Sequence, residues 1–125
     1  MTEASENQGI ESQKQMFREL LIEITALALL TVSIAMLWRD NMLLFMVVLA
    51  ECLTMLLVWH ERYDLYFFAA IAVLSSLIEA VFVHFQVWQY SNPTFLGVPL
   101  WFPIAFGTAA LTGQRFVRTL TLMFQ

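Results

Sequence analysis

Three glutamates lie inside long apolar stretches of this 125-residue chain: Glu23 in ELLIEITALALL, Glu51 in VVLAECLTML and Glu79 in VLSSLIEAVFVHF. A carboxylate costs about 3 kcal/mol near the middle of a bilayer, so such residues usually face the interior of a helix bundle and are protonated or paired. We expect no Lys or Arg inside the membrane to neutralise them. Each glutamate either hydrogen-bonds two helices together or handles a proton, as a proton-binding site or a catalytic acid.

Glu79 is the first candidate for a catalytic acid. Ser75, Phe82 and Gln86 recur with it at helical spacing, which gives its helix a polar stripe. His84 follows on the same helix, but its offset of about 140° around the axis makes a direct pair with Glu79 unfavourable.

The segment WQYSNPTFLGVPLWFPIAFG, residues 88–107, is the most distinctive part of the chain. Pro103 cannot donate the amide hydrogen bond that a regular helix would give to the carbonyl of Pro99. The spacing predicts a kink, or a helix that begins inside the membrane boundary. Irregular backbone at that depth survives only where it is buried in protein or lines a cavity. The alternative is an ordinary Pro-kinked helix. The expected pocket is lined by Trp88, Tyr90, Pro99, Trp101 and Pro103.

The composition indicates the elements that must carry these residues. The chain is 60% hydrophobic and 13% charged, whereas a soluble domain is about half apolar and about a quarter charged. Apolar runs cover residues 17–38, 42–59, 65–88 and, more briefly, 95–111; a helix needs about 20 residues to cross hydrocarbon. We predict an all-α integral membrane bundle of about four transmembrane helices, forming one domain over residues 16–125.

The remaining segments are short. Residues 1–15 are polar and predict a flexible N-terminal tail or the fraying start of a helix. Residues 39–41 leave room only for a tight antiparallel hairpin between the first two runs. Residues 114–125 place Phe116, Val117 and Leu120 opposite Arg115 and Thr119, which predicts a short interfacial amphipathic helix or the solvent-reaching end of the fourth run.

The positions of the basic residues predict the orientation. Lys14, Arg18, Arg62, Arg115 and Arg118 would lie on one side of the membrane and only Arg39 on the other. The side richer in Lys and Arg is usually cytoplasmic. We therefore expect both termini in the cytoplasm of a multi-pass protein, in a prokaryotic inner membrane.

Residues 79–107 resemble a family of membrane-embedded carotenoid biosynthesis proteins that includes the bacterioruberin-precursor hydratases. The matching residues are Glu79 on a helix, then Trp88 and Tyr90, then Leu96-Gly97-Val98-Pro99 with Pro103 opening the next helix. The resemblance implies acid-catalysed addition of water to an isoprenoid double bond, with Glu79 as the proton donor.

Three functional hypotheses follow. The first is a small accessory or assembly subunit that packs against partner membrane proteins or membrane lipids through its 11 Phe and 7 Met, alone or as an oligomer. The second is an isoprenoid-modifying, hydratase-like enzyme that uses Glu79. The third is a small proton-coupled transporter that uses Glu23 or Glu51. No basic patch with aromatics predicts nucleic-acid binding, one Cys and two His predict no metal site, and no particular cofactor is indicated.

Overall fold

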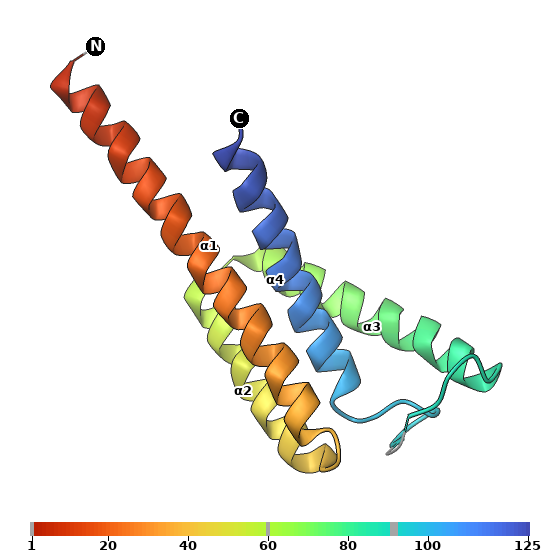
Figure 1. Ribbon diagram of the computed structural model, residues 1–125. Coiled ribbons are helices and arrows are strands. Elements are labelled where there is room, and N and C mark those ends of the chain that lie inside the picture. Colours follow the sequence, from red (N-terminus) through yellow and green to blue (C-terminus); the bar gives the residue numbers. More distant parts are fainter. Residues whose placement is uncertain (1, 60, 91–92) are drawn as a thin grey trace.

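The computed structural model describes residues 2–59, 61–90 and 93–125. Its described residues form four helices, α1 (Glu3–Leu37), α2 (Asn41–Trp59), α3 (Arg62–His84) and α4 (Phe102–Met123). Figure 1 shows α1, α2 and α4 running side by side, while α3 leaves them at a wide angle. Three of these helices, α1 to α3, are long and apolar enough to cross a membrane. The all-helical prediction is therefore confirmed for the described part of the chain.

The N-terminal segment is the first part of α1. Thr2 caps this helix, since its hydroxyl oxygen accepts a hydrogen bond from the Ser5 amide at 3.4 Å, and Glu3 and Glu6 favour the positive end of the helix dipole. Residues 3–15 are thus helical, and the flexibility expected of this segment stays a prediction. With 35 residues, α1 is about 52 Å long and exceeds the hydrocarbon thickness of about 30 Å.

The predicted hairpin between the first two runs is confirmed. α1 ends at Leu37 and α2 begins at Asn41, and the two helices pack against each other (Figure 1). The Asp40 carboxylate caps α2 by accepting a hydrogen bond from the Leu43 amide at 3.1 Å. Capping in so short a turn stops α1 and starts α2 almost at once.

α4 is the central helix, because it makes the most extensive contacts with both α1 and α3 and also packs against α2. Its first turns join the main apolar core through Phe102 and Ala105, against Leu30 of α1 and Leu44 of α2. Further along, Gly107 brings α4 close to α3, where a Cβ at that position would collide with the Phe68 ring. The small residue therefore lets α3 cross α4 at close range.

Of the two expectations for residues 114–125, the separate interfacial helix is wrong, and the segment is the end of the fourth helix. Residues 114–123 continue α4 without a break, and α4 begins at Phe102 rather than near residue 95. Its polar stripe faces inward, because Arg115 and Thr119 are buried while Val117 and Phe124 are exposed. A helix surrounded by apolar helices gains by turning polar groups toward partners inside the bundle.

The connection from α3 to α4 returns across the end of α3. Gln86 has a left-handed conformation, φ 61°, and the Val87 amide reaches back to the Phe82 carbonyl at 2.9 Å, which closes the helix end. A tight turn follows at residues 95–98, with φ 51° at Leu96 and φ 79° at Gly97. Of the two expectations for the proline segment, the structure has the helix start, with Pro103 in the first turn of α4.

Gly97 provides a test of this connection. Alanine at residue 97 would carry a Cβ in a left-handed conformation and against the Val83 side chain, so Gly97→Ala should lower the free energy of unfolding by about 1–3 kcal/mol. Thermal melting in detergent measures the effect. Gly113→Ala is the matched control, since nothing lies within 4 Å of its Cβ position, and it should leave the melting temperature unchanged or slightly raised. Equal melting of the two variants would contradict the tight-turn geometry.

Candidate functional site

The Glu79 carboxyl is held by two donors from the connection. Its Oε1 accepts hydrogen bonds from the Trp88 indole N–H and from the Tyr90 hydroxyl. No hydrogen bond to its Oε2 is made by the described residues, and Glu79 as a whole is 8% exposed. One oxygen is therefore fixed and the other is available to a ligand.

Local structure explains how these donors reach a helix that ends before them. The left-handed Gln86 turns the chain back after α3, so that the Trp88 ring packs on the edge of Phe82, with ring centroids 5.3 Å apart. Tyr90 packs against Phe102 at the start of α4, at 5.9 Å. Burial, and then its hydrogen bond to Glu79, raises the pKa of Tyr90 above its usual value. The Tyr90 hydroxyl thus stays a donor across the physiological pH range.

A cavity of about 600 Å³ opens beside this carboxyl. We call it the Glu79 cavity, and apart from Ser75, Gln89 and the carboxyl itself its walls are apolar or aromatic. Several of its wall residues, including Ile78, Trp88 and Phe106, are also exposed on the outside of the bundle. A molecule can therefore enter it sideways from an apolar surrounding. The lining residues are Ser75, Ile78, Glu79, Phe82, Trp88, Gln89, Tyr90, Phe102 and Phe106.

The structure separates the other predicted pocket residues from Glu79. Pro99 and Pro103 line a different groove of about 340 Å³, formed with Ala72, Val73 and neighbouring α3 residues. Trp101 is buried in the core, and its indole N–H makes no hydrogen bond to the described residues. Of the predicted lining residues, Trp88 and Tyr90 are the two that meet Glu79.

The other two glutamates of the apolar helices meet hydroxyl groups on neighbouring helices. Glu23 of α1 lies 2.9 Å from the Thr119 hydroxyl of α4, and Glu51 of α2 lies 2.7 Å from the Ser33 hydroxyl of α1. In each case the second carboxyl oxygen, Oε2, is buried and finds no partner in the described structure. The three glutamates therefore lie at three separate sites.

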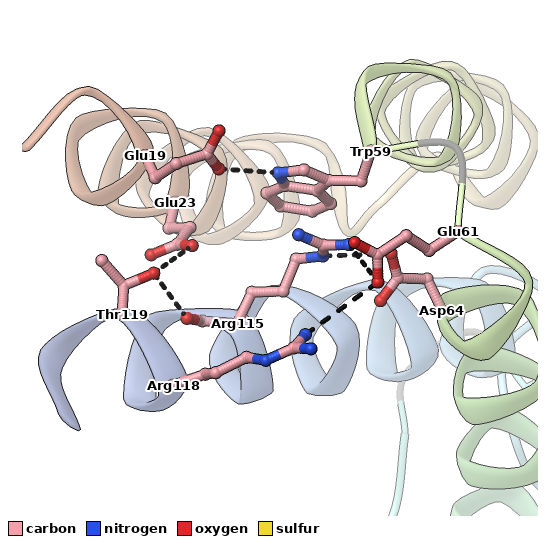
Figure 2. Close-up of polar contacts among 8 residues, drawn as sticks. All are labelled: Glu19, Glu23, Trp59, Glu61, Asp64, Arg115, Arg118 and Thr119. Carbon is pink, nitrogen blue, oxygen red and sulfur yellow. Dashed lines mark hydrogen bonds and ion pairs between the residues drawn. The ribbon is translucent and has the colours of Figure 1, made fainter. Parts of the chain in front are cut away.

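A polar cluster at the other end of the bundle was missed by the sequence analysis. Its centre is Arg115, whose Nε donates to Asp64 Oδ2 at 3.0 Å, while Nη2 contacts the same oxygen and Glu61 at 3.2 Å. The guanidinium also lies over the Trp59 ring, 4.4 Å from its centroid, as Figure 2 shows. We call this the Arg115 cluster, which comprises Glu19, Glu23, Trp59, Glu61, Asp64, Arg115, Arg118 and Thr119.

The Arg115 cluster joins all four helices. Arg115 and Thr119 belong to α4, Asp64 to α3 and Trp59 to α2, and the Trp59 indole donates to Glu19 of α1 at 3.0 Å. The expectation that no Lys or Arg is available to the glutamates of the apolar runs is corrected for Glu23, because the buried Arg115 lines the same cavity. The available signal was the spacing of Thr108, Thr112, Arg115 and Thr119, a polar stripe typical of an inward helix face.

A second cavity, of about 680 Å³, opens between α1 and α4 beside this cluster. Glu19 and Glu23 lie on its α1 wall, and Arg115 and Arg118 lie on its α4 wall. No family model matches this sequence, and no curated protein and no solved structure matches it. A functional proposal therefore rests on the chemistry of the Glu79 cavity and of the Arg115 cluster.

The Arg115–Asp64 pair should dominate stability at this end. Arg115→Met leaves the Asp64 charge buried without its partner, which should cost about 3–5 kcal/mol; chemical denaturation in detergent measures it. Replacing both partners, as Asp64→Leu with Arg115→Met, should restore part of the loss, because no lone charge remains.

Arg118→Met is the matched control. The Arg118 side chain is 52% exposed and lies 4.0 Å from Glu61, so its loss should change stability by less than about 1 kcal/mol. A double variant as unstable as Arg115→Met alone would mean that the lone Asp64 charge is not the cause.

Proposed function

We propose that the chain is a multi-pass membrane protein with four crossings and with both termini on the cytoplasmic side. The Arg115 cluster groups the α2–α3 turn with the C-terminal half of α4, and an Asn41–Thr94 hydrogen bond of 3.3 Å groups the α1–α2 turn with the α3–α4 connection. The connections thus alternate between two ends, and Figure 1 has both termini toward one of them. The excess of Lys and Arg at that end supports a cytoplasmic assignment.

Within that membrane, the Glu79 cavity binds an apolar isoprenoid-type lipid, and Glu79 acts on it as an acid. The observation that carries this proposal is the free Oε2 of Glu79, which lies in a largely aromatic cavity while Oε1 is held by Trp88 and Tyr90. Pockets of this kind, mostly apolar with a few convergent polar groups, are the usual form of a ligand site.

The proposed reaction adds water across a carbon–carbon double bond. The proton of the Glu79 carboxylic acid bonds to one alkene carbon, and the π electrons form that C–H bond and leave a carbocation at the other carbon. A water oxygen bonds to the carbocation, and the proton it releases returns to the Glu79 carboxylate. The product is an alcohol, and no oxidant or reductant is consumed.

The cavity offers stabilisation for both charges that this reaction creates. The faces of aromatic rings attract cations, and Phe82, Phe102 and Phe106 line the cavity. The two hydrogen bonds to Glu79 become stronger as the carboxyl loses its proton, since donors bind a charged oxygen more tightly. Such prearranged donors lower the energy of a transition state.

Glu79→Gln tests the catalytic role, because it keeps the size of the side chain and an oxygen for Trp88 and Tyr90 but removes the transferable proton. With an acyclic carotenoid such as lycopene in lipid nanodiscs, the wild-type protein should form a product heavier by one water, measured by mass spectrometry. Glu79→Gln should lower the rate by at least 100-fold, and Tyr90→Phe should lower it about 10-fold.

Glu11→Gln, at an exposed position in α1 that does not line the cavity, should be fully active. An active Glu79→Gln protein would refute Glu79 as the proton donor. Wild-type protein that binds no isoprenoid and adds no water would refute the enzyme.

A role as an accessory subunit is the second candidate. It is favoured by the outer faces of α1 and α2, which expose Val32, Met36, Met42 and Met46. Methionine-rich apolar surfaces adapt to partner proteins. After mild extraction, an accessory subunit should purify in fixed stoichiometry with a larger membrane protein, as measured by native mass spectrometry. Recovery of the chain alone, stable and monodisperse, would contradict this role.

A further inference from the structure

Two hydroxyl groups in the bundle each face two acceptors. The Ser33 oxygen lies 2.7 Å from the Leu29 carbonyl and 2.7 Å from Glu51. The Thr119 oxygen lies 2.9 Å from the Arg115 carbonyl and 2.9 Å from Glu23. A hydroxyl carries one proton and can donate only one full hydrogen bond, although it can also accept.

Every acceptor in these two contacts receives a proton if both carboxyls, Glu23 and Glu51, are protonated. Each hydroxyl then donates to the carbonyl four residues before it, as Ser and Thr commonly do in helices, and accepts a hydrogen bond from the carboxylic acid. If the carboxyls were ionised, each hydroxyl would have to serve two acceptors with one proton. The Oε2 atoms of Glu23 and Glu51 are buried and have no partner among the described residues. Each carboxylate would then carry a negative charge that no donor on Oε2 compensates.

The absence of charged groups from the described walls of the cavity beside Glu51 also favours a protonated carboxyl there. Glu51 lines an apolar cavity of about 340 Å³ between α1, α2 and Thr108 of α4. Its other walls are Ala26, Leu29, Val47, Ala50, Thr54 and Met55, none of which can ionise. An ionised Glu51 would have no counter-ion in this cavity.

Glu23 has charged neighbours in its cavity, but the buried cation among them, Arg115, is already paired with other carboxyls. Arg115 of α4 is engaged by Asp64 and Glu61 at the start of α3. The remaining ionisable groups are Glu19 of α1, which adds negative charge and accepts from Trp59 of α2, and Arg118, which lies across the cavity beside Glu61.

We propose that Glu23 and Glu51 are intramembrane proton-binding sites, each a carboxylic acid that donates its proton to a hydroxyl on a neighbouring helix. The proposal concerns neither Glu79 nor its ligand, so it stands apart from the proposed enzyme. The two sites differ in access. Glu23 lies on the polar cavity between α1 and α4, and its proton exchanges with water there. Glu51 lies on the apolar cavity, and its proton exchanges more slowly.

Infrared spectroscopy of the full chain in nanodiscs tests this directly. At neutral pH, a protonated carboxyl has a C=O stretch that is absent from a carboxylate. The wild-type spectrum should contain one such band that disappears in Glu23→Gln and another that disappears in Glu51→Gln. On transfer to D2O, the Glu23 band should shift at least 10-fold faster than the Glu51 band. Glu11→Gln, which alters an exposed acid, should remove carboxylate absorption only.

Ser33→Ala and Thr119→Val test the same proposal if a glutamine variant fails to fold. Each removes the hydroxyl acceptor but leaves the acid, so the matching C=O band should move to higher frequency and not disappear. The proposal would be overturned if Glu23→Gln and Glu51→Gln lost carboxylate absorption and left every carboxylic acid band unchanged. Unmoved bands in both hydroxyl variants would also overturn it.

Discussion

The buried ion pair between Arg115 and Asp64 is the constraint that organises this bundle. Removing two charges from water costs several kcal/mol each, and only close pairing with further hydrogen bonds offsets that cost. Arg115 meets this condition with Asp64, Glu61 and the Trp59 ring. Because these partners come from the α2–α3 region, the pair holds α4 at one depth and one rotation against the other helices.

The position of α4 then determines the composition of the Glu79 cavity. With Arg115 fixed at one end, the first turns of α4 place Phe102 and Phe106 opposite the end of α3. Gly107 allows the close crossing between them, since any side chain there would meet Phe68. The connection closes over the same region through Trp88 and Tyr90, which bond to the carboxyl. An aromatic cavity with one acidic group therefore depends on an ion pair at the opposite end of the helix.

The three glutamates of the apolar helices follow one rule, which is that each finds a partner on another element. Glu23 meets Thr119, Glu51 meets Ser33, and Glu79 meets the connection after its own helix. Bonds of this kind contribute about 0.6–2 kcal/mol each in membranes. Their larger effect is on specificity, because a rotation of α1, α2 or α3 would separate a carboxyl from its partner. The partners differ between the sites: aliphatic hydroxyl groups contact Glu23 and Glu51, whereas an indole N–H and a tyrosine hydroxyl contact Glu79.

The sequence by itself determined the features that depend on neighbouring residues. The apolar runs predicted α1, α2 and α3, residues 39–41 predicted the tight hairpin, and the proline spacing allowed the helix start at Phe102. The three glutamates were also identified as the residues that needed partners. These features follow from hydropathy, turn length and backbone chemistry, which are local properties of the chain.

Only the tertiary structure decided which groups those partners are. Arg115 and Asp64 are 51 residues apart, and Glu23 and Thr119 are 96 apart, so their meeting depends on how the helices cross. The amphipathic pattern of residues 114–125 could place its polar stripe toward water or toward the bundle, and packing of α4 among three apolar helices selected the bundle. Likewise, Trp88 and Tyr90 reach Glu79 only because the left-handed Gln86 turns the chain back. Contacts of this kind are set by packing geometry, which no local pattern in the sequence specifies.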